Sequence, residues 1–221
     1  MLERVGVLLS GCGVFDGAEI HEAVITLLAL DLAGAKAICM APNAPQAQVI
    51  NHLTQEETKE TRNVLVESAR IARGDIQDLA HVKADQLDAL IITGGFGAAK
   101  NLSSFAFDGP RGSVHPEVQR LIREMVDQNK PIGAMCIAPA ALTMAVDLAP
   151  QVTIGKDPDT AAALESMGAT HKKCPVHDIV VDNVNRLVTT PAYMLGPGIK
   201  DVAEGIEKLV NQVISMISQP R

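Results

Sequence analysis

The stretch from Lys130 to Leu142 constrains the fold more than any other part of the chain. Residues 131–135 form a short apolar run typical of a buried strand, Cys136 ends it, and a helix pattern that begins with Pro139 follows. A side chain at such a strand-to-helix turn lies at the carboxyl edge of an α/β sheet, where ligands usually bind. The helix dipole favours a thiolate at Cys136, as in a nucleophile elbow. Free cysteine is also commonly a small buried apolar residue, and this alternative stays open.

Strand and helix patterns alternate along almost the whole chain. We expect strands at 4–10, 35–41, 76–79, 87–93, 131–135, 151–154, 179–182 and 186–190, and helices at 19–32, 61–73, 116–128, 160–167 and 198–217. The last two strands form a hairpin through Asn183 and Asn185. This order predicts a mostly parallel sheet with helices on both faces, in a single α/β domain over residues 1–221.

Two further segments carry patterns that predict what lies on the surface. The first helix has a 3.6-residue period that places Ile20, Val24, Leu27 and Leu28 along one face, with Asp31 at its edge. Residues 42–58 are polar and contain two prolines, which predicts a surface excursion with a short strand at 48–51.

Composition excludes several classes of function. The net charge of -7 provides no electrostatic footprint for nucleic acid, and no apolar run approaches membrane-spanning length. The four cysteines lie far apart without a Cys/His cluster at metal-ligand spacing, so we expect no metal site. The glycines that follow the first strand lack the spacing of a dinucleotide fingerprint. We expect no cofactor and a reduced, cytoplasmic setting.

Adjacent glycines follow the strand at 87–93. Gly94 and Gly95 put backbone N–H groups at the edge of the sheet, which is suitable for binding an anion or an oxyanion. A tight turn that needs a positive φ explains the same residues equally well.

Three separated motifs resemble the ThiJ/PfpI superfamily, which has the class I glutamine amidotransferase-like, flavodoxin-type fold. They are Gly17 to Glu22, Thr93 to Leu102, and Gly133 to Pro139. Further runs resemble the ElbB branch of isoprenoid-biosynthesis-associated proteins with glyoxalase activity, and this resemblance covers nearly the whole chain. They are Leu9 to Val14, Glu60 to Leu65, and Ala192 to Met194. The resemblance implies a flavodoxin-like three-layer sandwich and a homodimer.

The resemblance also implies a set of site residues. Cys136 matches the nucleophile, Glu22 matches its acidic partner and proton shuttle, and the backbone N–H groups of Gly95 and Ile137 match an oxyanion hole. Asn101 and Gly94 are candidate substrate contacts. Glu19 lies three residues before Glu22, and its simpler interpretation is a favourable charge at the helix N-terminus.

The sequence departs from the family pattern at the third catalytic position. Gly155 stands where many members carry a histidine, and residues 189–193 lack the His-x-Glu of true glutamine amidotransferases. His21 points about 100° away from Glu22 on a helix, so we expect it to face elsewhere. We expect His177 to be solvent-facing or structural, and assign no base to His171.

The favoured hypothesis is a cofactor-free, glutathione-independent glyoxalase that acts on a small dicarbonyl. The Cys136 sulfur adds to the aldehyde, Glu22 moves a proton between the two carbons, and water releases a 2-hydroxy acid, glycolate in the case of glyoxal. Deglycase activity is a variant of the same chemistry. A redox-sensing or regulatory binding protein, associated with isoprenoid metabolism, is the alternative, since an accessible low-pKa cysteine also suits peroxide sensing. An amidotransferase-like domain that serves a partner enzyme is a weaker third hypothesis.

Overall fold

The protein is built around one seven-stranded sheet. A computed structural model describes residues 2–219, and within them the strand order is β3-β2-β1-β4-β5-β9-β8. The strands are β1 (Arg4–Leu8), β2 (Lys36–Ala41), β3 (Gln77–Asp78), β4 (Ala89–Ile92), β5 (Ile132–Met135), β8 (Val180–Asp182) and β9 (Leu187–Thr190). All neighbouring strands are parallel except β8 and β9, which form the predicted antiparallel hairpin.

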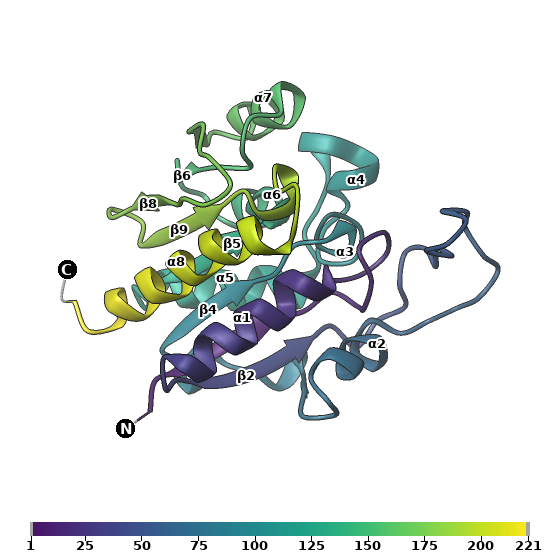
Figure 1. The fold of residues 1–221 in the computed structure, drawn as a ribbon, viewed down its shortest axis with the longest axis horizontal. Coiled ribbons are helices and arrows are strands. Elements are labelled where there is room, and N and C mark those ends of the chain that lie inside the picture. The colour runs from purple at the N-terminus through teal and green to yellow at the C-terminus, as the bar shows by residue number, and fades with distance from the viewer. Residues whose placement is uncertain (1, 220–221) are drawn as a thin grey trace.

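Helices cover both faces of this sheet (Figure 1). One face carries α1 (Ile20–Leu32), α2 (Val64–Ile71) and α8 (Ile199–Ile217), with α1 and α8 side by side. The other face carries α5 (Pro116–Asp127) and α6 (Ala138–Ala145). Shorter elements complete the fold: α3 (Phe96–Lys100), α4 (Phe105–Asp108), α7 (Pro158–Ser166), and the 3₁₀ turns η1 (Leu79–His81), η2 (Ala84–Gln86), η3 (Gly109–Arg111) and η4 (Ala192–Met194). The predicted flavodoxin-like three-layer α/β sandwich is confirmed.

The core follows from the period of the central strands. In β4, Ala89 and Ile91 pack with α1 and α8, whereas Leu90 and Ile92 pack with α5 and α6. Successive side chains of a strand point to opposite faces, and both faces of this sheet are covered. A central strand therefore needs apolar residues at every position, which explains the continuous apolar runs in the sequence.

Two predicted strands differ in the structure. Residues 48–51 form no strand, and the excursion is held by isolated bridges between Ile50 and Glu57 and between Pro45 and Asn63. The strand predicted at 151–154 is shorter, as β6 (Gln151–Val152), and pairs with β7 (Thr170–His171) in a separate two-stranded sheet. Both segments lie outside the main sheet, where short pairings depend on contacts that local sequence does not encode.

The apolar stripe of α1 faces away from the core. Ile20, Val24 and Leu28 are 42%, 48% and 52% exposed, and Leu32 is 75% exposed. The buried side of α1 is lined by Glu22, Ala23, Thr26, Ala29 and Leu30. Alanines, polar side chains and Leu30 thus fill the core side of α1, where the predicted face residue Leu27 also packs, and the remaining apolar residues form an exposed surface.

Candidate active site

Cys136 lies in the elbow between β5 and α6. Its φ of 59° is in the left-handed region, which is unfavourable for a residue with a side chain. Its backbone N–H donates to the Thr190 carbonyl (3.1 Å), and α6 begins two residues later with Pro139 in its first turn. The sharp turn directs the sulfur toward the carboxyl edge of the sheet, as expected of a nucleophile elbow.

Glu22 meets this sulfur from the first turn of α1. Its side chain is completely buried and hydrogen-bonds with the Cys136 thiol. The N–H of Gly94 donates to Glu22 Oε2 (3.0 Å), and the N–H of Tyr193 donates to Oε1 (3.1 Å). Three separate segments therefore fix the carboxyl group against the cysteine.

Glu19 has the simpler role that the sequence suggested. It is the N-cap residue of α1, and its Oε2 accepts a hydrogen bond from the N–H of Glu22 (2.7 Å). A carboxylate at this place satisfies a free N–H and complements the helix dipole.

Burial dominates the electrostatics of the pair. Desolvation raises the pKa of Glu22 to about 8, so the carboxyl group is largely protonated at neutral pH. Desolvation, followed by the negative charge on Glu22, raises the pKa of the Cys136 thiol well above its usual value. The expected preference for thiolate is thus wrong for the resting protein, because burial outweighs the hydrogen bonds that the sulfur receives.

Two backbone donors converge on the sulfur. The N–H groups of Gly95 and Ile137 both hydrogen-bond to Cys136 and lower the pKa of its thiol, against the larger effect of burial. Gly95 is the N-cap residue of α3 with a φ of 90°, so glycine is needed there for backbone reasons as well. The structure therefore brings together Cys136, Glu22, Gly95 and Ile137, as the sequence predicted.

The two candidate substrate contacts are occupied by the protein itself. Asn101 donates to the carbonyls of Ser10 and Asp16 (2.8 Å each) and accepts from the N–H of Ala47 (2.9 Å). The Gly94 N–H is bound to Glu22, and a Cβ added at Gly94 would overlap with Cys136 and Glu22. These contacts make Asn101 a clamp between loops and Gly94 a spacer for the reactive pair.

Among the described residues, no hydrogen bond joins His21, His171 or His177 to Cys136 or Glu22. Gly155 has a φ of 96°, and a Cβ added there would lie 2.6 Å from Leu195 Cγ, so a larger residue does not fit. His177 is exposed, as expected, and His171 Nε2 lies 3.4 Å from the N–H of Ile154. His21 points away from Glu22 and lies 2.9 Å from the Tyr193 hydroxyl through Nδ1.

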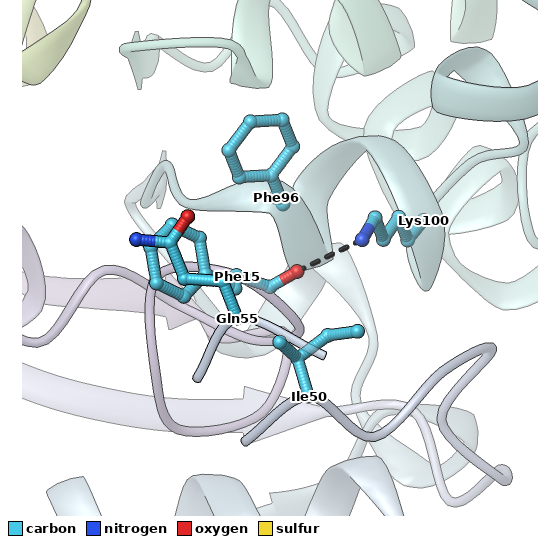
Figure 2. A pocket seen from close by; sticks show the side chains of 5 residues that line it. All are labelled: Phe15, Ile50, Gln55, Phe96 and Lys100. Atoms are coloured by element: carbon cyan, nitrogen blue, oxygen red, sulfur yellow. Dashed lines mark hydrogen bonds between the residues drawn. The ribbon is translucent and has the colours of Figure 1, made fainter. Parts of the chain in front are cut away.

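A pocket of about 540 Å³ opens beside Cys136. It is lined by Val14, Gly95, Phe96, Ala99, Phe105, Ala106, Cys136, Ile137, Asp157, Thr160, Tyr193 and Met194. Phe96 also borders a smaller hollow of about 160 Å³, where Lys100 donates to the Phe15 carbonyl (2.9 Å), as Figure 2 shows.

Tyr193, Phe96 and Phe105 were not predicted as pocket residues. Phe96 and Phe105 form the aromatic wall of the pocket. Tyr193 belongs to η4, a single turn with no periodicity, and α3 and α4 are too short to give a helical pattern. Because the chain has only four phenylalanines, one tyrosine and no tryptophan, each aromatic residue was a candidate for a role outside the core.

Across residues 2–219, no group of three or more His, Cys, Asp or Glu side chains could hold a metal ion. Within the same part of the chain, every helix is too short or too polar to span a bilayer.

Several named proteins are similar to this chain in sequence. The profile of the DJ-1/PfpI family matches residues 12–192. A Rattus norvegicus protein named "ES1 protein homolog, mitochondrial" is 45% identical, over 96% of this chain and 84% of its own length. A Homo sapiens protein named "glutamine amidotransferase-like class 1 domain-containing protein 3, mitochondrial" is 44% identical, over 96% and 83%.

A solved structure extends the similarity to three dimensions. It is an Ehrlichia chaffeensis protein described as an isoprenoid biosynthesis protein with an amidotransferase-like domain. The TM-score is 0.90 at 39% sequence identity, over 96% of this chain and 99% of the other.

Proposed function

The chain belongs to the DJ-1/PfpI family, and from this premise we propose that it is a glutathione-independent, glyoxalase-type enzyme that converts 2-oxoaldehydes to 2-hydroxy acids. The observation that carries the proposal is the buried pair of Glu22 and Cys136, with the N–H groups of Gly95 and Ile137 on the same sulfur. Cys136, Gly95 and Ile137 line the pocket and Glu22 is buried beside the sulfur, which supports the roles of nucleophile, oxyanion donors and proton carrier.

The first step is addition of sulfur to the aldehyde. The reactive form of the pair holds one proton, on Glu22, while the sulfur is a thiolate. The sulfur attacks the aldehyde carbon, the carbonyl electrons move to oxygen, and the N–H groups of Gly95 and Ile137 stabilise that oxygen. The oxygen then takes the Glu22 proton, which leaves a hemithioacetal on Cys136 and a carboxylate at Glu22.

The second step moves hydrogen between the two carbons. The Glu22 carboxylate removes the C–H proton of the hemithioacetal carbon, and the electrons form an enediolate. Glu22 returns a proton to the neighbouring carbon, the former ketone oxygen becomes a hydroxyl, and the hemithioacetal hydroxyl loses its proton. The product is a thioester, in which one carbon is oxidised and its neighbour is reduced.

Water completes the reaction. It attacks the thioester, the C–S bond breaks, and sulfur regains a proton. The sum is a 2-oxoaldehyde plus water giving a 2-hydroxy acid, so no oxidant or external thiol is consumed. Deglycase activity on glycated amines would use the same sulfur addition.

The decisive experiment measures glycolate formation from glyoxal in the absence of glutathione and added metal. We expect the wild type to form glycolate, and Cys136→Ala and Glu22→Gln to lose at least about 100-fold in rate, in the range for loss of a proton-transfer group. Glycolate formation that persists in Cys136→Ala, or that is absent from the wild type, would contradict the proposal.

The groups around the sulfur favour catalysis over redox sensing. Burial raises the pKa of the Cys136 thiol and disfavours the resting thiolate that both functions need. Glu22 and the N–H groups of Gly95 and Ile137 provide a proton carrier and oxyanion donors, which catalysis needs and peroxide sensing does not. Amidotransferase chemistry lacks its His-x-Glu at Thr189–Tyr193.

We include a homodimer and a reducing compartment in the proposal. The exposed stripe of α1, formed by Ile20, Val24, Leu28 and Leu32, supports a second copy of the chain as its partner. Free cysteines are typical of proteins in a reducing compartment. The four in this chain are compatible with the cytoplasm, and equally with the mitochondrion that the relatives' names give.

A further inference from the structure

The aromatic side chains of this protein gather at the mouth of the candidate active site. Of four phenylalanines and one tyrosine, Phe96, Phe105 and Tyr193 line the pocket beside Cys136. Phe15 and Phe96 both line the smaller hollow described above (Figure 2). None of the five is fully buried, although Phe105 and Tyr193 pack against the edge of the core, which is built from aliphatic residues, Met, Ala and Cys.

This distribution differs from what packing alone would produce. Aromatic side chains bury large areas and normally contribute strongly to the core. Here Phe96 is 48% exposed, and Phe105 and Tyr193 are half-buried. Large apolar groups left accessible around a nucleophile are explained by a ligand that covers them.

The size of the pocket also indicates a ligand larger than glyoxal. Its volume of about 540 Å³ lies within the roughly 300–1,000 Å³ of sites for drug-sized ligands. Glyoxal, with two carbons and two oxygens, would fill only a small part of it. Apart from Tyr193, the polar side chains in the wall are Asp157 and Thr160, which both belong to the N-terminal turn of α7.

The charges around the pocket restrict the substituent. No Lys, Arg or His is among the described residues that line it. Hydrogen bonds from Thr160 hold the pKa of Asp157 below its usual value, so this carboxylate is charged at neutral pH. Lys100 lies in the neighbouring hollow and donates to the Phe15 carbonyl. An anionic substituent would therefore meet the negative charge of Asp157 in the pocket itself, whereas Lys100 lies outside the lining, 5.4 Å from the centroid of the Phe96 ring.

We propose that the physiological substrate is a 2-oxoaldehyde with an uncharged, bulky apolar substituent, aromatic or branched, that packs against Phe96 and Phe105. This inference rests on the proposed function and names its substrate class. The dicarbonyl end lies at Cys136 and the substituent occupies the aromatic wall.

The test compares phenylglyoxal with glyoxal in the wild type and in two phenylalanine variants. Phe105 and Phe107 belong to the same turn of α4, but only Phe105 lines the pocket, and Phe107 is 52% exposed. We expect Phe105→Ala to lower the ratio of kcat/KM for phenylglyoxal to that for glyoxal about tenfold, as loss of one aromatic contact implies. We expect Phe107→Ala to change neither value.

The outcomes separate this inference from the proposed function. Equal effects of Phe105→Ala and Phe107→Ala, or equal loss with both substrates, would overturn the inference while glyoxalase activity stands. No turnover of either aldehyde by the wild type would overturn both. Binding of acetophenone to Cys136→Ala, measured by calorimetry, provides a readout without chemistry. We expect it to weaken in the Cys136→Ala/Phe105→Ala double variant, and unchanged affinity would contradict the inference.

Discussion

At the scale of the residue, Glu22 is the group whose behaviour departs most from its intrinsic chemistry. An exposed glutamate titrates near 4.5, but complete burial raises the pKa of Glu22 to about 8. Its two backbone donors lower the pKa less than desolvation raises it. The group is therefore neutral where nearly all glutamates are charged, and it can donate a hydrogen bond to sulfur.

This shift predicts a pH-dependent contribution to stability. Between about pH 4.5 and 8 the folded protein keeps a proton that the unfolded chain has lost. The stabilisation is complete below pH 4.5 and is lost as pH rises through about 8. Each pKa unit corresponds to about 1.4 kcal/mol in the free energy of unfolding.

Glu22→Gln removes the titration while keeping the shape of the side chain. We expect the variant to be less stable than the wild type at pH 5, and the difference to shrink or reverse by pH 8. Urea unfolding at several pH values measures it. A constant difference across this range would contradict the assigned pKa shift.

At the scale of the element, the site depends on a close approach of three chain segments. The elbow after β5, the first turn of α1 and the loop after β4 meet at Gly94, where any side chain would overlap with Cys136 and Glu22. The absence of a Cβ at Gly94 thus allows Cys136 and the Glu22 carboxyl group to lie this close together.

Gly94→Ala should therefore damage the site sterically. We expect a loss of about 1–3 kcal/mol in the free energy of unfolding, typical of overpacking, and at least a tenfold loss of 2-oxoaldehyde turnover. Gly198→Ala is the matched control, because a Cβ there meets nothing nearer than Asp201 Oδ2 at 3.8 Å. Equal stability and activity in the two variants would refute the spacer role.

At the scale of the whole molecule, the stripe on α1 predicts how two copies assemble. A two-fold axis would pair this helix with its own copy, so each apolar residue meets an apolar surface. A stable interface of standard size covers about 800 Å² per partner, so neighbouring residues must contribute as well.

Leu28→Glu tests this assembly. We expect light scattering to report a dimer for the wild type and a monomer for the variant, because a charge in an apolar interface is costly. Leu53→Glu serves as the control, since Leu53 is 92% exposed in the excursion at 42–58. A monomeric wild type, or a variant that stays dimeric, would contradict the proposed homodimer.

The fold was predictable from the sequence pattern. Parallel strands covered on both faces must be apolar at every position, so the strands, their alternation with helices and the elbow at Cys136 could be recognised along the chain. The resemblance of three motifs to the family indicated that Glu22, Gly95 and Cys136 would meet, and the shared edge at the carboxyl ends of parallel strands agrees with that placement.

Only the tertiary structure decided how these groups behave. The pKa of Cys136 and of Glu22 depends on burial by segments far apart in sequence, which reversed the thiolate prediction made from the helix dipole. The outward face of α1 likewise depends on what packs against the helix, which its 3.6-residue period does not record. Desolvation and packing are properties of neighbours in space, so local sequence could not settle either one.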